Sequence, residues 1–360
     1  MLRKLAVFML SSLALAGWAA AAGPKDGATV TIMTQNMDDG TDQTYIIAAL
    51  LGIIPGLTVE SAVDLTYMEL QASNFGERAR LMAEQIAEKG PELVALQEAA
   101  LWRFGPTPAT ATDVLYDPLE LLLAELRTLD APYEVVAMNS LSDLALPGEL
   151  IGGALRFTDR NAVLVRSDLR PPGFHLSNVH SRTFEAAFPL GGLTVTAGWI
   201  SADVHMGNRQ FRFVTTHLQS PIAGIKEATD VQVAQAQELI HALRNVRVPV
   251  VICGDFNSDA THSGFVDTTP TVGLIEAAGY PEVWPKTHGD NESGLTWPWY
   301  LEDQYPPPFF APSAPFERID LFFSRGLNVV SSNLVIAPAS GYPMPPYASD
   351  HAGVIAVFRP

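Results

Sequence analysis

Cysteine is almost absent from this sequence, since Cys253 is the only one in 360 residues. A single cysteine excludes an intramolecular disulfide, and its place inside an apolar run predicts a small buried side chain rather than a reactive thiol. Basic residues are also scarce, because 22 Lys and Arg stand against 39 Asp and Glu and give a net charge of −17. This balance disfavours tight passive binding to phosphate-rich polymers, unless a metal ion supplies positive charge locally.

Two hydrolase signatures are missing as well. No G-x-S-x-G elbow of a serine hydrolase occurs, and no two histidines stand at the i, i+4 spacing of a helical zinc site. No repeat or low-complexity linker divides the chain either. An apolar content of 48% nevertheless allows a substantial core, so we expect a folded protein rather than a disordered one.

The N-terminus has the pattern of a secretory signal peptide. Arg3 and Lys4 precede an apolar run, Leu5–Ala16, and a tract of small residues follows it. We therefore predict a signal peptide at residues 1–22 and a single domain at residues 23–360. The mature protein should be secreted or periplasmic, and we expect a monomer, because nothing in the sequence implies a protein partner.

A buried strand that ends in polar residues is the strongest local feature. Val250–Cys253 is a continuous apolar run, and Gly254, Asp255, Phe256 and Asn257 follow it. In an extended chain residues i and i+2 point to the same side. Asp255 and Asn257 should therefore present a carboxylate and an amide together at one edge of a sheet.

Other predicted strands also end in polar residues or begin with them. These strands cover residues 28–36, 92–97, 211–218, 318–323 and 353–358. Carboxylates and amides are the ligands that Mg²⁺ prefers, and imidazoles can stabilise charge that grows on phosphoryl oxygens. The set suits metal-assisted attack on phosphorus, and its members are Asn36, Glu98, His217, Asp255, Asn257, Asp320, Asp350 and His351.

Three stretches have a less certain role. The run 45–57 is apolar but too short to span a membrane, so we interpret it as a buried helix or lid, with a lipid-touching element as the alternative. Residues 297–316 are rich in aromatic residues and proline, which suits either a self-packed loop or an aromatic surface for a lipid, sugar or base. Residues 140–153 are rich in turn-forming residues and predict a loop.

Seven short motifs in order resemble the endonuclease/exonuclease/phosphatase superfamily, which includes the DNase I-like nucleases. Together they extend over essentially the whole mature chain. The resemblance implies an α/β fold, a two-sheet β-sandwich flanked by helices in four layers. The motifs are T-Q-N at 34–36, L-Q-E at 96–98, T-H-L at 216–218, G-D-F-N at 254–257, G-L-T-W at 294–297, R-I-D at 318–320 and S-D-H at 349–351.

The same resemblance implies a divalent-metal site. Asn36 and Glu98 would hold the ion, with Asp38 or Asp350 as a further ligand. Mg²⁺ is the expected cofactor, and Mn²⁺ is the expected substitute.

The resemblance also implies the catalytic roles. Asp255 would orient the attacking water, and Asn257 would bind the phosphate or steady Asp255. Asp320 would hold His351 in its working tautomer, and His351 and His217 would contact the scissile phosphate.

The residues and the resemblance are compatible with several substrate classes. We expect a phosphodiesterase of the nuclease-like or sphingomyelinase-like kind, acting on nucleic acid, phospholipid or a small phosphodiester, with lipid contact through 45–57 or 297–316 as an open possibility. The alternatives are a phosphomonoesterase of the inositol-phosphatase type and a non-catalytic binding module that kept the fold.

Overall fold

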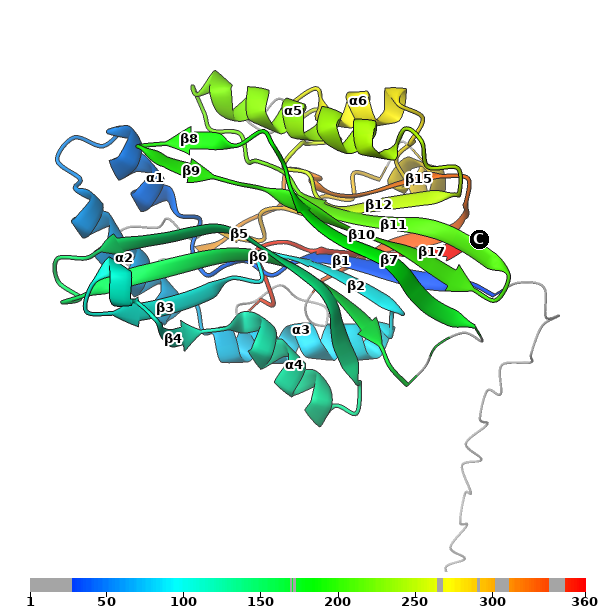
Figure 1. Cartoon of the computed structure of the whole chain (residues 1–360), viewed down its shortest axis with the longest axis horizontal. Coiled ribbons are helices and arrows are strands. Elements are labelled where there is room, and N and C mark those ends of the chain that lie inside the picture. The colour runs from blue at the N-terminus through cyan, green and yellow to red at the C-terminus, as the bar shows by residue number, and fades with distance from the viewer. Residues whose placement is uncertain are drawn as a thin grey trace, which may run out of the picture.

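Two β-sheets lie face to face in the computed structural model (Figure 1). The structure describes residues 28–168, 170, 173–263, 268–289, 292–301, 311–336 and 347–360, so the predicted signal peptide lies outside the described residues. The larger sheet has eight strands: β16 (Asn328–Val335), β17 (Gly353–Arg359), β1 (Val30–Asn36), β2 (Leu93–Gln97), β6 (Ala154–Arg166), β3 (Leu101–Gly105) and β4 (Asp113–Tyr116) in this order, with β5 (Tyr133–Pro147) paired to β6.

The smaller sheet has five strands, and two short two-stranded ribbons accompany the main sheets. The order in the smaller sheet is β15 (Asp320–Arg325), β12 (Val250–Asp255), β11 (Arg209–His217), β10 (Gly198–Met206) and β7 (Phe174–Thr183). The ribbons pair β8 (Phe188–Leu190) with β9 (Leu193–Val195), and β13 (Tyr300–Leu301) with β14 (Ala311–Pro312).

Alternate residues of the central strands enter different cores, which explains why these strands are apolar throughout. In β12, Val251 and Cys253 lie in the core between the sheets, whereas Ile252 packs beneath the helices on the outer face. Because both faces of the strand are covered, a continuous apolar run is expected rather than an alternating one. Cys253 is fully buried, as predicted, and burial raises the pKa of its thiol.

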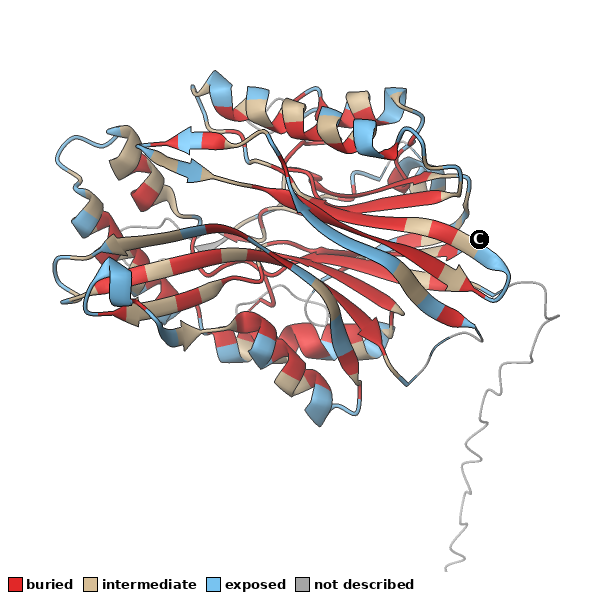
Figure 2. Ribbon diagram, viewed as in Figure 1, coloured by how far each residue is buried: buried red, intermediate tan, exposed pale blue. Residues whose placement is uncertain are grey.

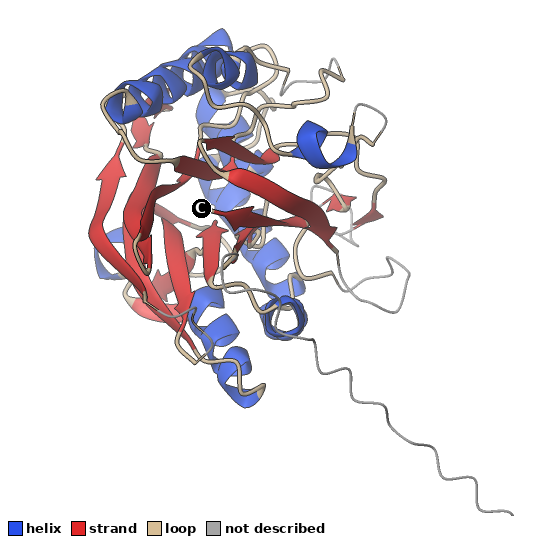
Figure 3. Ribbon diagram, turned by 90° about the vertical axis from the view of Figure 1, so that its right-hand side faces the viewer, coloured by secondary structure: helices blue, strands red, loops and turns tan. Residues whose placement is uncertain are grey.

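Helices cover the outer face of each sheet and complete a four-layer sandwich (Figures 1, 2 and 3). The helices α3 (Phe75–Lys89) and α4 (Pro118–Thr128) pack on the larger sheet, and α5 (Lys226–Leu243) and α6 (Thr271–Ala277) pack on the smaller one. Figure 2 shows the buried residues concentrated along the sheets and on the inner sides of these helices. The predicted two-sheet sandwich flanked by helices is confirmed.

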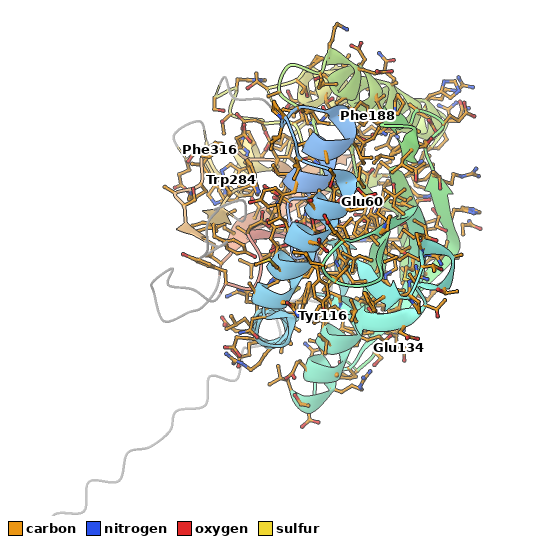
Figure 4. The ribbon with its side chains drawn as sticks, turned by 90° about the vertical axis from the view of Figure 1, so that its left-hand side faces the viewer. Glu60, Tyr116, Glu134, Phe188, Trp284 and Phe316 are labelled. Carbon is orange, nitrogen blue, oxygen red and sulfur yellow. The ribbon has the colours of Figure 1, made fainter. Side chains whose placement is uncertain are left out.

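A helical pair covers one end of the molecule, and Figure 4 looks directly at it. These helices are α1 (Thr44–Leu51) and α2 (Val59–Ala72), and α1 packs against β8 through Phe188. The buried helix predicted at 45–57 is correct only for its first half, because Ile53 and Ile54 are 54% and 42% exposed. No helix in the described ranges is long and apolar enough to cross a membrane.

The loop predicted at residues 140–153 is wrong. β5 continues to Pro147, which pairs with Ala154 of β6, so only the six residues between them form the turn. One irregularity in the register, between Ser140 and Asp143, lies among the turn-forming residues and does not end the strand. Pairing along a long partner strand therefore overrides the local turn propensity.

The remaining elements are short. A single turn of 3₁₀ helix lies at Pro108–Thr110, and α7 spans Trp284–His288. Within the predicted 297–316 segment, residues 302–310 lie outside the described residues, and Tyr300 of β13 pairs with Pro312 of β14.

Gly254 allows β11 and β12 to approach closely where the site begins. Its φ is +141°, and a Cβ there would lie 1.9 Å from the carbonyl oxygen of Thr216.

We predict that Gly254→Ala lowers the free energy of unfolding by about 3 kcal/mol or more, because the backbone of β11 or β12 must move. The control is Gly273→Ala in α6, where a Cβ meets nothing and alanine should add about 0.5–1 kcal/mol. Equal effects of the two substitutions in urea unfolding would contradict this explanation.

Candidate active site

Strand register places three site residues in one row across the smaller sheet. His217 at the end of β11 is paired with Asp255 at the end of β12, and Asp255 is paired with Asp320 at the start of β15. β11 and β12 are parallel and β15 runs antiparallel to them, so all three residues lie at the same edge. The register of these strands therefore brings the three residues together, as the sequence predicted.

The larger sheet supplies two more residues from its own parallel pair. β1 ends at Asn36, which lies opposite Gln97 of β2, and Glu98 follows directly. Asn36 Nδ2 donates to Glu98 Oε1 at 2.8 Å and to Asp255 Oδ2 at 3.0 Å. The amide therefore joins the two sheets at this edge.

The turns that follow β2 and β12 each contain a residue with left-handed backbone. Glu98 has φ of +52° and Asn257 has φ of +46°, a region that costs free energy for residues other than glycine, although asparagine tolerates it best. The backbone N–H of Asn257 donates to Asp255 Oδ1 at 2.8 Å, and its Nδ2 lies 3.0 Å from both Leu218 O and His217 Nε2. Asn257 thus orients Asp255 and contacts His217 in one conformation.

His351 and Asp320 form a buried pair. His351 Nδ1 lies 2.8 Å from Asp320 Oδ2, so the ring donates from Nδ1 and turns Nε2 toward Asp255 Oδ2 at 3.9 Å. Although burial alone would lower it, the carboxylates of Asp320 and Asp350 hold the pKa of His351 well above its usual range. The protonated imidazolium is therefore the favoured form.

The pKa of His217 is also shifted in opposite directions by burial and by nearby acids. Burial lowers its pKa, but Asp255, Glu98 and Asp159 raise it further, and the net direction is upward. Its Nε2 lies 3.6 Å from Asp255 Oδ2 and 3.8 Å from Glu98 Oε1. Two imidazoles therefore face the same carboxylate from neighbouring elements.

The donor atoms fit a divalent cation. Ligand atoms of Glu98, His217 and Asp255 lie within 4.8 Å of one another, and the same holds for Asp255, Asp320 and His351. Among the ion pairs of the described residues, no Lys or Arg contacts Glu98 or Asp255. Burial first, and then Asp320, raises the pKa of Asp255. Carboxylates and amide oxygens are the ligands that Mg²⁺ prefers, and in the described part of the chain no Lys or Arg neutralises these acids.

The two further acids predicted as ligands have polar partners of their own. Asp38 Oδ2 forms a buried ion pair with Arg78 at 2.8 Å and accepts a hydrogen bond from the Tyr300 hydroxyl. Asp350 Oδ2 accepts from the indole nitrogen of Trp297 at 2.8 Å, and its Oδ1 lies 3.9 Å from His351 Nε2. A metal contact by either acid stays a prediction.

Two acids at the site were not among the predicted residues. The N–H of Asp39 donates to Glu98 Oε2 at 3.1 Å, and burial followed by Glu98 raises the pKa of Asp39 well above its usual value. Burial raises the pKa of Asp159 to about 6, although the nearby His217 opposes this. The sequence signals were an acid directly after the first strand and an acid before the apolar run of β6.

Comparison with known proteins identifies a family and several structures with the same fold. The family model for the endonuclease/exonuclease/phosphatase family matches residues 69–351, whereas no curated protein sequence matches the chain. An endonuclease/exonuclease/phosphatase from Beutenbergia cavernae aligns over 92% of this chain and 71% of that one, with 20% identity and a TM-score of 0.55.

Two further solved structures share the fold. D. rerio TDP2 complexed with single strand DNA product covers 92% of this chain and 100% of its own, with 15% identity and a TM-score of 0.52. The human Nocturnin catalytic domain with bound sulfate anion covers 92% and 94%, with 19% identity and a TM-score of 0.51. Since the family model spans most of the chain, this protein belongs to the endonuclease/exonuclease/phosphatase family of metal-dependent phosphoester hydrolases.

Proposed function

We propose that this protein is an exported, Mg²⁺-dependent phosphodiesterase that directs a water molecule in line at a phosphodiester. The observation that carries the proposal is the row of His217, Asp255 and Asp320 on one sheet, facing Asn36 and Glu98 on the other. A carboxylate for the water, two imidazoles for developing charge and oxygen ligands for a cation meet at one point.

Asn36 and Glu98 would hold the metal ion. Bound there, Mg²⁺ would polarise the phosphoryl oxygens and neutralise their charge. Asn36 offers an amide oxygen to this site only if its side chain turns, because in the structure its nitrogen faces the two acids and its Oδ1 accepts from the N–H of Asp38. The O and N atoms of an amide have almost the same shape, so the turned side chain fits the same space, although the hydrogen bond from the N–H of Asp38 is lost.

Asp255 would orient the attacking water and take its proton. Its side chain is 1% exposed, and the N–H of Asn257 fixes one of its oxygens. Burial and the neighbouring Asp320 raise its pKa, which makes it a stronger base than a solvated aspartate. Asn257 thereby has a defined task, which is to point the base.

His351 and His217 would donate hydrogen bonds to the phosphoryl oxygens as negative charge grows on them. The ion pair with Asp320 leaves His351 Nε2 as the donor that faces the reaction centre. Nearby acids raise the pKa of both rings, which favours the protonated form that such a donor requires.

The choice of a diester rests on charge. A chain of net charge −17 offers few cations for the several phosphates of an inositol polyphosphate, whereas a diester carries one negative charge per phosphate. The D. rerio TDP2 structure holds a single strand DNA product, which supports a nucleic-acid diester as one candidate. The filled catalytic positions argue against a non-catalytic module.

The first prediction concerns activity and metal removal. Purified protein should hydrolyse bis-p-nitrophenyl phosphate with Mg²⁺ or Mn²⁺ and lose this activity in EDTA. The same assay with DNA, RNA, sphingomyelin and inositol phosphates then assigns the substrate class. Activity that persists in EDTA would contradict the proposal, and so would the absence of activity on every ester of the panel.

Replacement of the proposed base and of the dyad histidine should stop the reaction without unfolding the protein. Asp255→Asn removes a buried charge, and His351→Asn keeps a donor near the position of Nδ1, so Asp320 is not left unpaired. Each should lower kcat by about 10²–10⁴, with a thermal midpoint equal to wild type or higher for Asp255→Asn. Asp230→Asn, on the exposed face of α5, is the control and should leave kcat unchanged. Full specific activity in either site variant would assign these residues a structural role.

Asp350→Asn should flatten the pH dependence of stability in metal-free protein. Burial raises the pKa of Asp350 to about 7, whereas the unfolded chain titrates near about 4. Between these values the folded state keeps a proton that the unfolded state has lost, so the free energy of unfolding falls as pH rises. The variant lacks this loss, and the difference between variant and wild type should grow by about 2–4 kcal/mol from pH 4 to pH 7.

Urea unfolding in EDTA measures this difference. Asp113→Asn, at an exposed position of β4, serves as the control. A variant that runs parallel to wild type over the whole pH range would contradict the prediction.

A further inference from the structure

The G-L-T-W motif at residues 294–297 has no part in the chemistry described above, yet it lies between the two elements that carry the dyad. Its glycine has φ of +60°, and a Cβ there would lie 2.3 Å from the Trp284 ring. Only glycine therefore lets the chain pass Trp284 on its way to the site.

Thr296 connects this segment to β15 and β17. Its fully buried hydroxyl accepts the N–H groups of Ile319 at 3.1 Å and Asp320 at 3.2 Å. The N–H of Ala352 donates to Thr296 O at 2.8 Å. One residue thus fixes the backbone on both sides of the His351–Asp320 pair.

Trp297 holds the acid next to His351. Its indole N–H donates to Asp350 Oδ2 at 2.8 Å, and the backbone N–H of Trp299 donates to Asp350 O at the same distance. The Trp297 ring packs edge-on against Phe316 and lies 6.3 Å, between ring centres, from His351.

The position of the Asp350 carboxylate matters because His351 Nε2 is the group that faces the reaction centre. Asp350 Oδ1 lies 3.9 Å from Nε2, which is too long for a hydrogen bond. A carboxylate beside an imidazolium gains free energy by closing such a gap. The indole N–H gives Asp350 a competing partner, and the other side-chain donor to this carboxylate in the described residues, the Ser349 hydroxyl, is at 3.4 Å.

We propose that Trp297 is a positioning residue whose indole N–H keeps Asp350 away from His351 Nε2, so that this nitrogen is free to bind the substrate phosphate. The inference rests on the proposed phosphodiesterase function. Without the indole N–H, the carboxylate turns toward Nε2 and pairs with it, and the phosphate must then break that pair.

Replacement of Trp297 by β-(3-benzothienyl)alanine, introduced at this position alone, is the most selective test, because the bicyclic shape stays and only the N–H is lost. Trp297→Phe is the genetic counterpart. With saturating Mg²⁺ and bis-p-nitrophenyl phosphate, both should lower kcat about ten- to a hundredfold, with a thermal midpoint near wild type. In an Asp350→Ala background Trp297→Phe should change kcat less than about twofold, since the acid that captures Nε2 is absent.

Trp299→Phe is the matched control, because the Trp299 indole nitrogen is buried and has no hydrogen-bond partner in the described chain. This variant should keep wild-type kcat. Equal losses in the Trp297 and Trp299 variants, or a loss at Trp297 that persists in Asp350→Ala, would overturn the inference. Wild-type protein that is inactive on every phosphoester would instead overturn the proposed function and this inference with it.

Discussion

Negative charge buried between two sheets is the constraint on which the site depends. Asp255 is nearly inaccessible to solvent, lies opposite Asp320 on the neighbouring strand, and shares the Asn36 amide with Glu98 of the other sheet. Its ion-pair partners among the described residues are the imidazoles of His217 and His351. Buried carboxylates of this kind are stable only with protons, imidazolium or a metal ion nearby.

Backbone pairing is what keeps these charges together. β12 is covered on both faces, with Cys253 in the core between the sheets and Ile252 beneath the helices. A shift of one residue would exchange these faces, so the register that aligns His217, Asp255 and Asp320 is strongly specified. The core packing of the strands therefore offsets the electrostatic cost of the site at their ends.

The sequence was sufficient for features that depend on local chain direction. Polar residues at the ends of buried strands predicted the convergence of Asn36, Glu98 and Asp255, because the loops at strand ends of an α/β sandwich lie together. Interactions between distant segments were not predictable: Asp38 pairs with Arg78 of α3, and the charge of His217 in the opposite sheet lowers the pKa of Asp159. The loop prediction at residues 140–153 failed for the same reason, because pairing with β6 extends β5 through residues that favour turns.

The same charge distribution constrains how an acidic protein can bind an anionic ester. With a net charge of −17, long-range attraction of a phosphate is absent, and the imidazoles that face Asp255 are held by carboxylates. Binding must therefore come from short-range groups that replace these internal partners: a cation on the acids, and imidazolium N–H groups that acids do not capture. Geometry that holds Asp320 on one nitrogen of His351 and keeps Asp350 from the other is thus as important as the presence of the histidine.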